Sequence, residues 1–173
     1  IGYEYSDLQI DDSRLVLINA QDAIFKGADF FLNTEVIDAK RVKDYWEIKL
    51  NNNQIKYSKT LINASGPWAV NTLKNICNIN TKRTLRLVQG SHIIISKNYK
   101  GEQAYILQQP DKRIVFIIPY LEKYLLIGTT DKEVEAFENP KITNEEIEYL
   151  LNACNIFLKK KISRNEIVFS YSG

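Results

Sequence analysis

"LINASGPW", spanning Leu61–Trp68, begins with apolar residues and changes within three positions to residues with almost no side chain. The apolar start is typical of a buried strand, whereas Ala64–Gly66 is too small to fill space in a core. Pro67 stands where the first turn of a helix favours proline, and apolar residues recur at helical spacing over residues 69–79. The stretch therefore predicts a buried strand that passes directly into a helix.

A turn of this kind has two interpretations. In open α/β sheets ligands bind where strands end, and the free amides of a helix N-terminus suit a phosphate, a carboxylate or the electron-rich edge of a cofactor. Small side chains allow such a ligand to contact the backbone. The alternative is a tight strand-to-helix turn with Trp68 filling the core. Spacing alone leaves both interpretations open.

The composition is that of a globular chain with a sizeable core. Of the 173 residues, 45% are hydrophobic and 25% are charged. The 23 basic and 21 acidic residues give a net charge of +2, too balanced to indicate nucleic acid or an anionic membrane as the main partner. Cys77 and Cys154 lack metal-ligand spacing, so the sequence predicts no metal site and two buried thiols in a reducing compartment.

The first part of the chain mixes helix and strand patterns. Asp11–Ser13 supplies N-cap candidates for a helix that ends near Gly27. Asn51–Asn53 is a turn. The predicted strands are Tyr3–Ile10, a strand leading into a second one over residues 29–42, Tyr45–Leu50, Gln54–Ser58 and Lys59–Asn63.

The second part is mostly β. The predicted strands are Thr84–Ser96, Gln103–Gln108, Arg113–Tyr120, Tyr124–Thr130 and Ile167–Ser172. Their short connections favour antiparallel pairing. Residues 143–162 predict a helix with Thr143 or Asn144 as its cap and Lys159–Lys161 at its negative end. We therefore expect an α+β fold dominated by an antiparallel sheet with flanking helices.

These residues resemble a known family. "LINASGPWAV" is similar to the segment of D-amino-acid-oxidase-like flavoproteins in which a strand ending in Asn-Ala-x-Gly-Pro-Trp reaches FAD. Within that superfamily, six segments follow the order seen in FAD-dependent, quinone-linked glycerol-3-phosphate dehydrogenases. They are "YSDLQIDDSRLVLINAQDA", "RLVQGSHIII", "AYILQQPDKRIVFIIPY", "IGTTD", "NEEIEYLLNACNIF" and "FSYSG".

The resemblance implies that the chain is an internal fragment, inactive alone. The family's Gly-x-Gly-x-x-Gly turn precedes the matched region. A Gly-Gly-Lys segment and the Arg of a Val-Arg-Pro-Leu continuation follow it. The implied divisions are a substrate-domain strand over 1–10, part of an FAD-binding α/β domain over 11–77, and a substrate-binding antiparallel sheet domain over 78–173.

Oxidation of glycerol 3-phosphate needs a base for the hydroxyl proton while hydride leaves carbon for the flavin. His92, the only histidine, occurs in "QGSHIII", and a neutral imidazole accepts a proton near physiological pH. By resemblance to the family's Gly-Ser-His segment, His92 is the candidate general base. The alternative is a hydrogen-bonded strand histidine.

The remaining site residues are also implied by the resemblance. The substrate-binding candidates are Ser91, Tyr120 and Thr130, and the cofactor-binding candidates are Val36, Ala64, Ser65, Gly66, Trp68 and Gly90. Val36 enters because a strand ending near it resembles the place where the superfamily's backbone contacts adenine or its ribose. Packing, or hydrogen bonds within a turn, is an equally good account of Gly90, Ser91 and Thr130. Arg83, Arg86 and Arg113 are possible phosphate ligands or solvated charges.

The implied partners are glycerol 3-phosphate as substrate and quinone as electron acceptor. The full protein is expected to be cytoplasmic and peripherally associated with the inner membrane of a bacterium. Two alternatives remain: another flavin oxidase of the superfamily acting on an amine or hydroxy acid, and a ligand-binding domain with no redox role.

Overall fold

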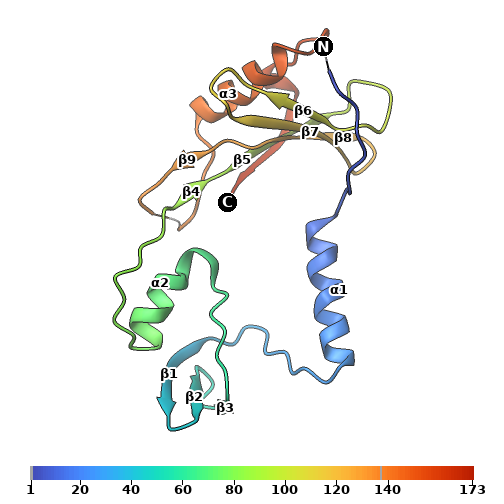
Figure 1. Cartoon of the computed structure of the whole chain (residues 1–173). Coiled ribbons are helices and arrows are strands. Elements are labelled where there is room, and N and C mark those ends of the chain that lie inside the picture. The colour runs from blue at the N-terminus through green and yellow to red at the C-terminus, as the bar shows by residue number, and fades with distance from the viewer. Residues whose placement is uncertain (1, 137) are drawn as a thin grey trace. The chain divides into compact units, whose positions relative to one another are not determined.

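The computed structural model describes residues 2–136 and 138–173, which form two compact units (Figure 1). The first unit contains the described residues up to Asn63 together with Asn71–Asn80. The second contains Ala64–Val70 and Thr81–Gly173. Mixed helices and antiparallel sheets confirm the predicted α+β class.

The first unit contains one long helix and a small sheet. The Asp11 carboxylate caps the helix by accepting a 2.9 Å hydrogen bond from the amide of Arg14, as the cap pattern predicted. The three strands pair antiparallel in the order β1-β2-β3. The elements are α1 (Asp12–Phe25), β1 (Val36–Val42), β2 (Tyr45–Leu50) and β3 (Ile55–Ser58).

The second unit is built on a five-stranded antiparallel sheet of order β10-β5-β8-β7-β6. A two-stranded ribbon joins β4 and β9. The elements are β4 (Val88–Gln89), β5 (Ser91–Ser96), β6 (Tyr105–Gln108), β7 (Ile114–Tyr120), β8 (Tyr124–Gly128), β9 (Lys132–Glu133), α3 (Asn144–Asn155), the 3-10 turn η3 (Arg164–Glu166) and β10 (Ile167–Ser172).

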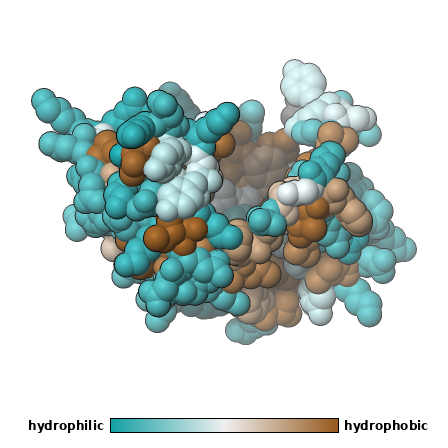
Figure 2. Space-filling model, turned by 90° about the horizontal axis from the view of Figure 1, so that it is seen from below, coloured by the Kyte–Doolittle hydropathy of each residue, from teal (hydrophilic) through white to brown (hydrophobic). Residues whose placement is uncertain are grey.

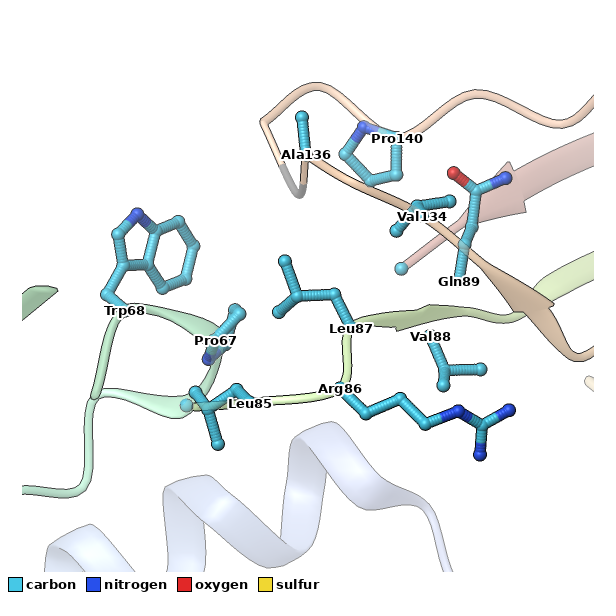
Figure 3. Close-up of a pocket in the computed structure, with 12 residues that line it drawn as sticks. Pro67, Trp68, Leu85, Arg86, Leu87, Val88, Gln89, Val134, Ala136 and Pro140 are labelled. Carbon is cyan, nitrogen blue, oxygen red and sulfur yellow. The ribbon is translucent and has the colours of Figure 1, made fainter. Parts of the chain in front are cut away.

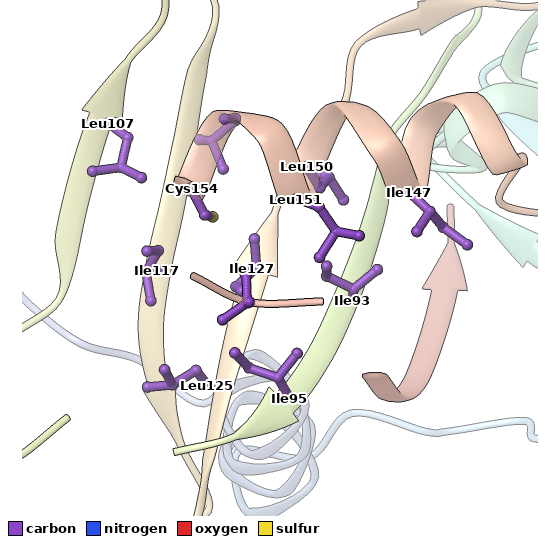
Figure 4. Close-up of a cluster of buried hydrophobic side chains, with 13 residues drawn as sticks. Ile93, Ile95, Leu107, Ile117, Leu125, Ile127, Ile147, Leu150, Leu151 and Cys154 are labelled. Atoms are coloured by element: carbon purple, nitrogen blue, oxygen red, sulfur yellow. The ribbon is translucent and has the colours of Figure 1, made fainter. Parts of the chain in front are cut away.

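The helix α3 covers one face of this sheet and closes the main core (Figure 4). Side chains alternate between the faces of a strand, so every second residue of β5, β7 and β8 points toward the helix. Ile93, Ile95, Ile117, Leu125 and Ile127 are fully buried there. From the helix, Ile147, Leu150, Leu151 and Cys154 pack into the same cluster.

The helix α3 begins as predicted and ends earlier. Thr143 and Glu146 form a reciprocal capping box. The helix ends at Asn155 because the Asn155 side chain pairs with the buried Ile162, accepting from its amide and donating to its carbonyl, both at 2.8 Å. The prediction that Lys159–Lys161 lies at the helix end is therefore wrong; these lysines follow it.

The chain after Pro67 is helical, as predicted, but its turns are mixed. A 3-10 turn η1 (Gly66–Trp68) leads into α2 (Ala69–Asn71) and a π-helical turn η2 (Thr72–Ile76). Cys77 follows and is buried, as is Cys154; both are free thiols, as expected.

Several predicted strands are wrong because no neighbouring strand pairs with them. Residues 2–11 and Lys59–Asn63 form neither helix nor strand, and Tyr3 is 94% exposed. Residues 29–35 contain a turn, so the strand expected to end near Val36 instead begins there. The strand expected over Thr84–Ser96 starts at Val88 and is interrupted at Gly90. Alternation alone, without ladder partners, does not make a strand.

We predict that Leu150→Ala lowers the free energy of unfolding by about 3 kcal/mol, because it leaves a cavity in the core under α3. The matched control is Ile156→Ala, at the end of the same helix and 62% exposed, which is expected to cost less than about 0.5 kcal/mol. Urea denaturation measures both. Equal losses would contradict the assigned core.

Candidate active site

His92 lies on β5, on the sheet face opposite α3. Its register partners are Tyr171 of β10 and Gly128 of β8. The imidazole stacks on the Tyr171 ring, with 5.0 Å between centroids and 10° between planes. A Cβ added to Gly128 would lie 2.1 Å from His92 Cδ2, and the Gly128 backbone is outside the left-handed region. Glycine is therefore needed at position 128 for the space that the imidazole occupies.

The surroundings of His92 keep its ring neutral. Burial lowers the pKa of His92 below its ordinary value of 6.5, because desolvation disfavours the imidazolium. Among the described residues, its buried Nδ1 has no hydrogen-bond partner. A neutral imidazole at physiological pH is able to take a proton from a bound hydroxyl.

The sheet face around His92 is apolar, and we call it the His92 face. Strand alternation and register place Ile94, Phe116, Leu126 and Phe169 on it. Its other large side chains are Ile106, Ile114, Ile118, Tyr120, Tyr124 and Tyr171. Several are substantially exposed, Phe169 by 59%. Figure 2 shows apolar residues, in brown, reaching the viewed surface among hydrophilic ones.

Tyr120, a predicted substrate contact, belongs to the His92 face but lies at its far end. Tyr120 pairs with Tyr124 of β8. On β7 it lies four positions after Phe116, which pairs with Gly128 next to His92. At 3.3 Å per residue this is about 13 Å along the strand. Tyr120 therefore shares a face with His92 without adjoining it.

The opening motif lines a cavity of about 600 Å³ within the second unit (Figure 3). Gly66, Pro67 and Trp68 contribute one wall, and Val134, Ala136 and Pro140 contribute another. The rest of the lining comes from the segment leading into β4 and from the end of β10: Leu85, Arg86, Leu87, Val88, Gln89 and Gly173. A mostly apolar cavity of this size fits the flat ring of a small-molecule cofactor.

The small residues of the motif now have separate explanations. Gly66 has φ +56°, a left-handed conformation that favours glycine, and an added Cβ would meet open space. Trp68 is 48% exposed at the cavity and does not fill the core. Ala64 is exposed and Ser65 half-buried beside the lining. The turn thus bends sharply and leaves its backbone accessible.

Gly90 adjoins this cavity through the backbone. It exchanges two hydrogen bonds of 2.8 and 2.9 Å with Gly173, which extends the β5–β10 ladder. A Cβ at Gly90 would lie 2.5 Å from Thr129 Oγ1. Because Gln89 lines the cavity and His92 follows three residues later, the cavity and the His92 face are about 10 Å apart along the chain.

Ser91 and Thr130, the other predicted substrate contacts, lie on the α3 side of the sheet. Ser91 is 0% and Thr130 3% exposed. Their hydroxyls donate to Glu146 Oε1 at 2.6 and 2.8 Å, and Thr130 Oγ1 accepts from the Ser91 amide at 2.9 Å. The structure does not bring these two hydroxyls to the face that carries His92.

Glu146 is a buried carboxylate, 5% exposed. Burial alone would raise the pKa of Glu146, but hydrogen bonds from the Ser91 hydroxyl, the Thr143 amide and the hydroxyls of Thr130 and Thr143 lower it to about 2. Glu146 is therefore ionised at neutral pH.

The remaining candidates lie elsewhere. Val36 begins β1 in the first unit and pairs with Leu50. Arg86 pairs with Glu133 at 3.3 Å and Asp131 at 3.9 Å. Arg113 pairs with Asp111 and lies over the Tyr149 ring, and Arg83 is exposed.

Residues 2–136 and 138–173 contain neither a candidate metal site nor a candidate membrane-spanning helix. No group of three or more His, Cys, Asp or Glu side chains is placed to hold a metal ion. No helix in this part of the chain has the length and apolar character needed to span a bilayer.

Comparison with known proteins decides the family. Residues 2–173 match the family described as "DAO: FAD dependent oxidoreductase". The chain belongs to this family. Its flavin chemistry fits the apolar cavity and the exposed glycine backbone of the "LINASGPW" turn.

Several relatives within the family cover nearly the whole chain. It is 41% identical over 178 residues to the aerobic glycerol-3-phosphate dehydrogenase of Escherichia coli, covering 99% of the chain and 36% of that protein. It is 39% identical over 178 residues to D-erythritol 1-phosphate dehydrogenase of Brucella abortus, covering 99% of the chain and 36% of that protein. The chain thus spans about a third of the length of these relatives.

A solved structure supports the same grouping. The glycerol-3-phosphate dehydrogenase from Bacillus halodurans complexed with FAD matches with a TM-score of 0.74 and 26% identity. The match covers 94% of this chain and 34% of that one.

Three residues of the site were not singled out from the sequence. The sequence did contain a sign of Tyr171, because Phe169 and Tyr171 alternate in the predicted strand and so place two aromatic rings on one face. Gly128 belongs to the matched segment "IGTTD", and Glu146 lies within the predicted helix over residues 143–162, but neither pattern indicates a role in the site. Their roles depend on register and on contacts between distant segments, which the sequence does not display.

We predict that Gly128→Ala costs about 1–3 kcal/mol of stability, because the new methyl group displaces the imidazole of His92. In a His92→Ala background the ring is absent, so the same substitution is expected to cost clearly less. Urea denaturation of the four proteins gives this double-mutant cycle. An equal cost in both backgrounds would show that the ring does not lie over Gly128.

Proposed function

We propose that this chain is part of an FAD-dependent glycerol-3-phosphate dehydrogenase, supplying the general base and one wall of the flavin site. The observation that carries the proposal is His92, neutral and lying over Gly128, on the strand that continues from the cavity of the "LINASGPW" turn. The 41% identity to the Escherichia coli enzyme over 99% of the chain supports the substrate.

We assign the residues to two regions of the intact protein. Residues 1–10 and 78–173 belong to the substrate-binding domain, and residues 11–77 to the FAD-binding domain. Gly66 and Trp68 would hold the flavin from the cavity wall, with the backbone of Ala64, Ser65 and Gly90 beside it. Val36, in the first unit, stays a candidate contact for adenine or its ribose. The exposed backbone at Gly66 and the apolar cavity support this assignment.

The reaction converts a secondary alcohol to a ketone. FAD, when bound, supplies the hydride acceptor. His92 takes the proton of the substrate hydroxyl; since its Nδ1 is buried, Nε2 is the nitrogen that we assign to this step. Tyr171 and Gly128 orient the ring by stacking and by the space left below it.

The polar candidates around His92 take different roles. Ser91 and Thr130 hold the strand and the turn beside His92, since their hydroxyls are already used by Glu146. Tyr120 lines the same face at a distance. Arg86 and Arg113 are paired with carboxylates, so we assign neither to the substrate phosphate.

A second substrate has nearly the same support. The relative named D-erythritol 1-phosphate dehydrogenase is 39% identical over 99% of the chain. Both substrates are polyol phosphates with a secondary hydroxyl, which is the group that His92 would deprotonate. Comparing reduction of the flavin by each compound separates the two.

A more specific proposal concerns the electron acceptor and the cellular location of the full protein. We infer quinone as the acceptor, which places the full protein in the cytoplasm at the inner face of a bacterial membrane. The relatives named aerobic glycerol-3-phosphate dehydrogenase support this assignment. Flavin reoxidation by a soluble ubiquinone analogue, and sedimentation with anionic lipid vesicles, test its two parts.

The function is tested on the full-length protein. We expect flavin absorbance in the purified protein and its loss on anaerobic addition of glycerol 3-phosphate. Flavin that is reduced only by an amine or a hydroxy acid would indicate another oxidase of the superfamily. A colourless protein that takes up no FAD would indicate a ligand-binding domain.

We predict that His92→Ala in the full-length protein slows flavin reduction on the order of a hundredfold or more, with flavin still bound. Because burial lowers the pKa of His92, the base stays neutral at pH 7, and kcat/KM should fall only as the pH drops below 6.5. In the variant, this fall of kcat/KM at low pH should be absent. A variant with unchanged rate and pH profile would remove His92 from the mechanism.

A further inference from the structure

Both oxygens of Glu146 are engaged, each with a different part of the fold. Oε2 closes the cap of α3, accepting from the amide and the hydroxyl of Thr143 at 2.9 and 3.0 Å. Oε1 accepts from Ser91 Oγ at 2.6 Å and from Thr130 Oγ1 at 2.8 Å. Gln89 Nε2 lies 3.3 Å from both oxygens. The carboxylate thus joins the helix start to two strands.

The two segments bonded to Oε1 carry His92 and Gly128, the glycine over which the imidazole lies. Ser91 directly precedes His92 on β5. Thr130 follows Gly128, over which the imidazole lies, by two positions. Ser91 Oγ also lies 2.8 Å from Ser172 Oγ, and Ser172 directly follows Tyr171, the stacking partner. The strand that carries His92 and the segment after Gly128 are therefore bonded to one carboxylate directly, and the end of β10 is linked to it through Ser91.

A carboxylate is required because every group around it donates. The ionised side chain accepts only, so it satisfies hydroxyls, amides and the Gln89 side chain at once. A glutamine at the same position would turn one of the two acceptors into a donor, so either the Thr143 amide or the hydroxyls of Ser91 and Thr130 would lose the acceptor that they now use. Burying the charge is costly, and the five donors offset that cost.

His92 itself provides little else to fix its orientation. Its buried Nδ1 has no hydrogen-bond partner within the described residues. Active-site histidines are commonly oriented by a carboxylate bonded to that nitrogen. The orientation of the imidazole here comes from stacking on Tyr171 and from contact with the backbone at Gly128. It therefore depends on how accurately the backbone positions these two residues.

We propose that Glu146 is a positioning residue for His92: its buried carboxylate, on the other side of the sheet, fixes β5, the segment after β8 and the end of β10 around the imidazole. The proposal rests on the function proposed above. It assigns to Glu146 no contact with substrate or flavin.

The first test uses Thr130 in the full-length protein. Thr130→Val keeps the shape but removes the hydroxyl, whereas Thr130→Ser keeps the hydroxyl. We expect Thr130→Val to lower the limiting rate of flavin reduction about tenfold or more, with the dissociation constant of glycerol 3-phosphate unchanged, and Thr130→Ser to restore the rate. A weakened dissociation constant with an unchanged rate would indicate direct substrate contact and overturn the proposal.

The second test compares two capping glutamates. Glu146→Gln should slow flavin reduction at least as much as Thr130→Val, with the flavin spectrum unchanged. Glu166→Gln is the matched control, because Glu166 closes the capping box of Ser163 and contacts neither Ser91 nor Thr130. It should leave the rate unchanged. If Glu146→Gln does not fold, the comparison of Thr130→Val with Thr130→Ser still tests the role of Glu146.

The outcomes separate this proposal from the function on which it rests. An unmodified protein that binds no FAD, or is not reduced by a polyol phosphate, refutes the proposed function. A wild-type protein that is reduced normally, with Thr130→Val and a folded Glu146→Gln equally fast, refutes only the role of Glu146.

Discussion

The packing of α3 against one face of the five-stranded sheet determines where every other group of the site lies. Ile93 and Ile95 are fully buried under the helix, so alternation forces His92 and Ile94 to the opposite face. A register slip of one residue would bury the imidazole and expose two isoleucines. The hydrophobic core therefore fixes the position of a polar residue that it does not contain.

Periodic patterns predicted the parts of the fold in which local sequence and burial agree. The residues Tyr45–Leu50 form β2 as expected, and the Thr143 cap begins α3. Tyr3–Ile10 alternates equally well, yet pairs with no strand. The histidine, the "LINASGPW" turn and the family were accessible from the sequence. The roles of Gly128 and Glu146 were not, since Gly128 meets His92 through strand register and Glu146 meets Ser91 and Thr130 through the packing of α3 on the sheet.

Three glycines contribute in three physical ways. Gly66 provides a backbone conformation that other residues rarely adopt, with open space beside it. Gly128 provides room for an aromatic ring, and Gly90 a close approach to the segment after β8. Only the first follows from a turn pattern. The other two concern what lies against the missing side chain, which explains why small residues near a site are easy to notice and hard to interpret.

The ring that stacks on His92 belongs to β10, which comes last in chain order among these five strands. β5 pairs with β8 through a shorter loop, whereas β10 joins it only after α3 and the intervening segments have been made. Closing that long loop is entropically costly and slow. Until β10 joins the sheet, β5 and β8 would therefore pair without Tyr171 in place, and the imidazole of His92 would lack its stacking partner.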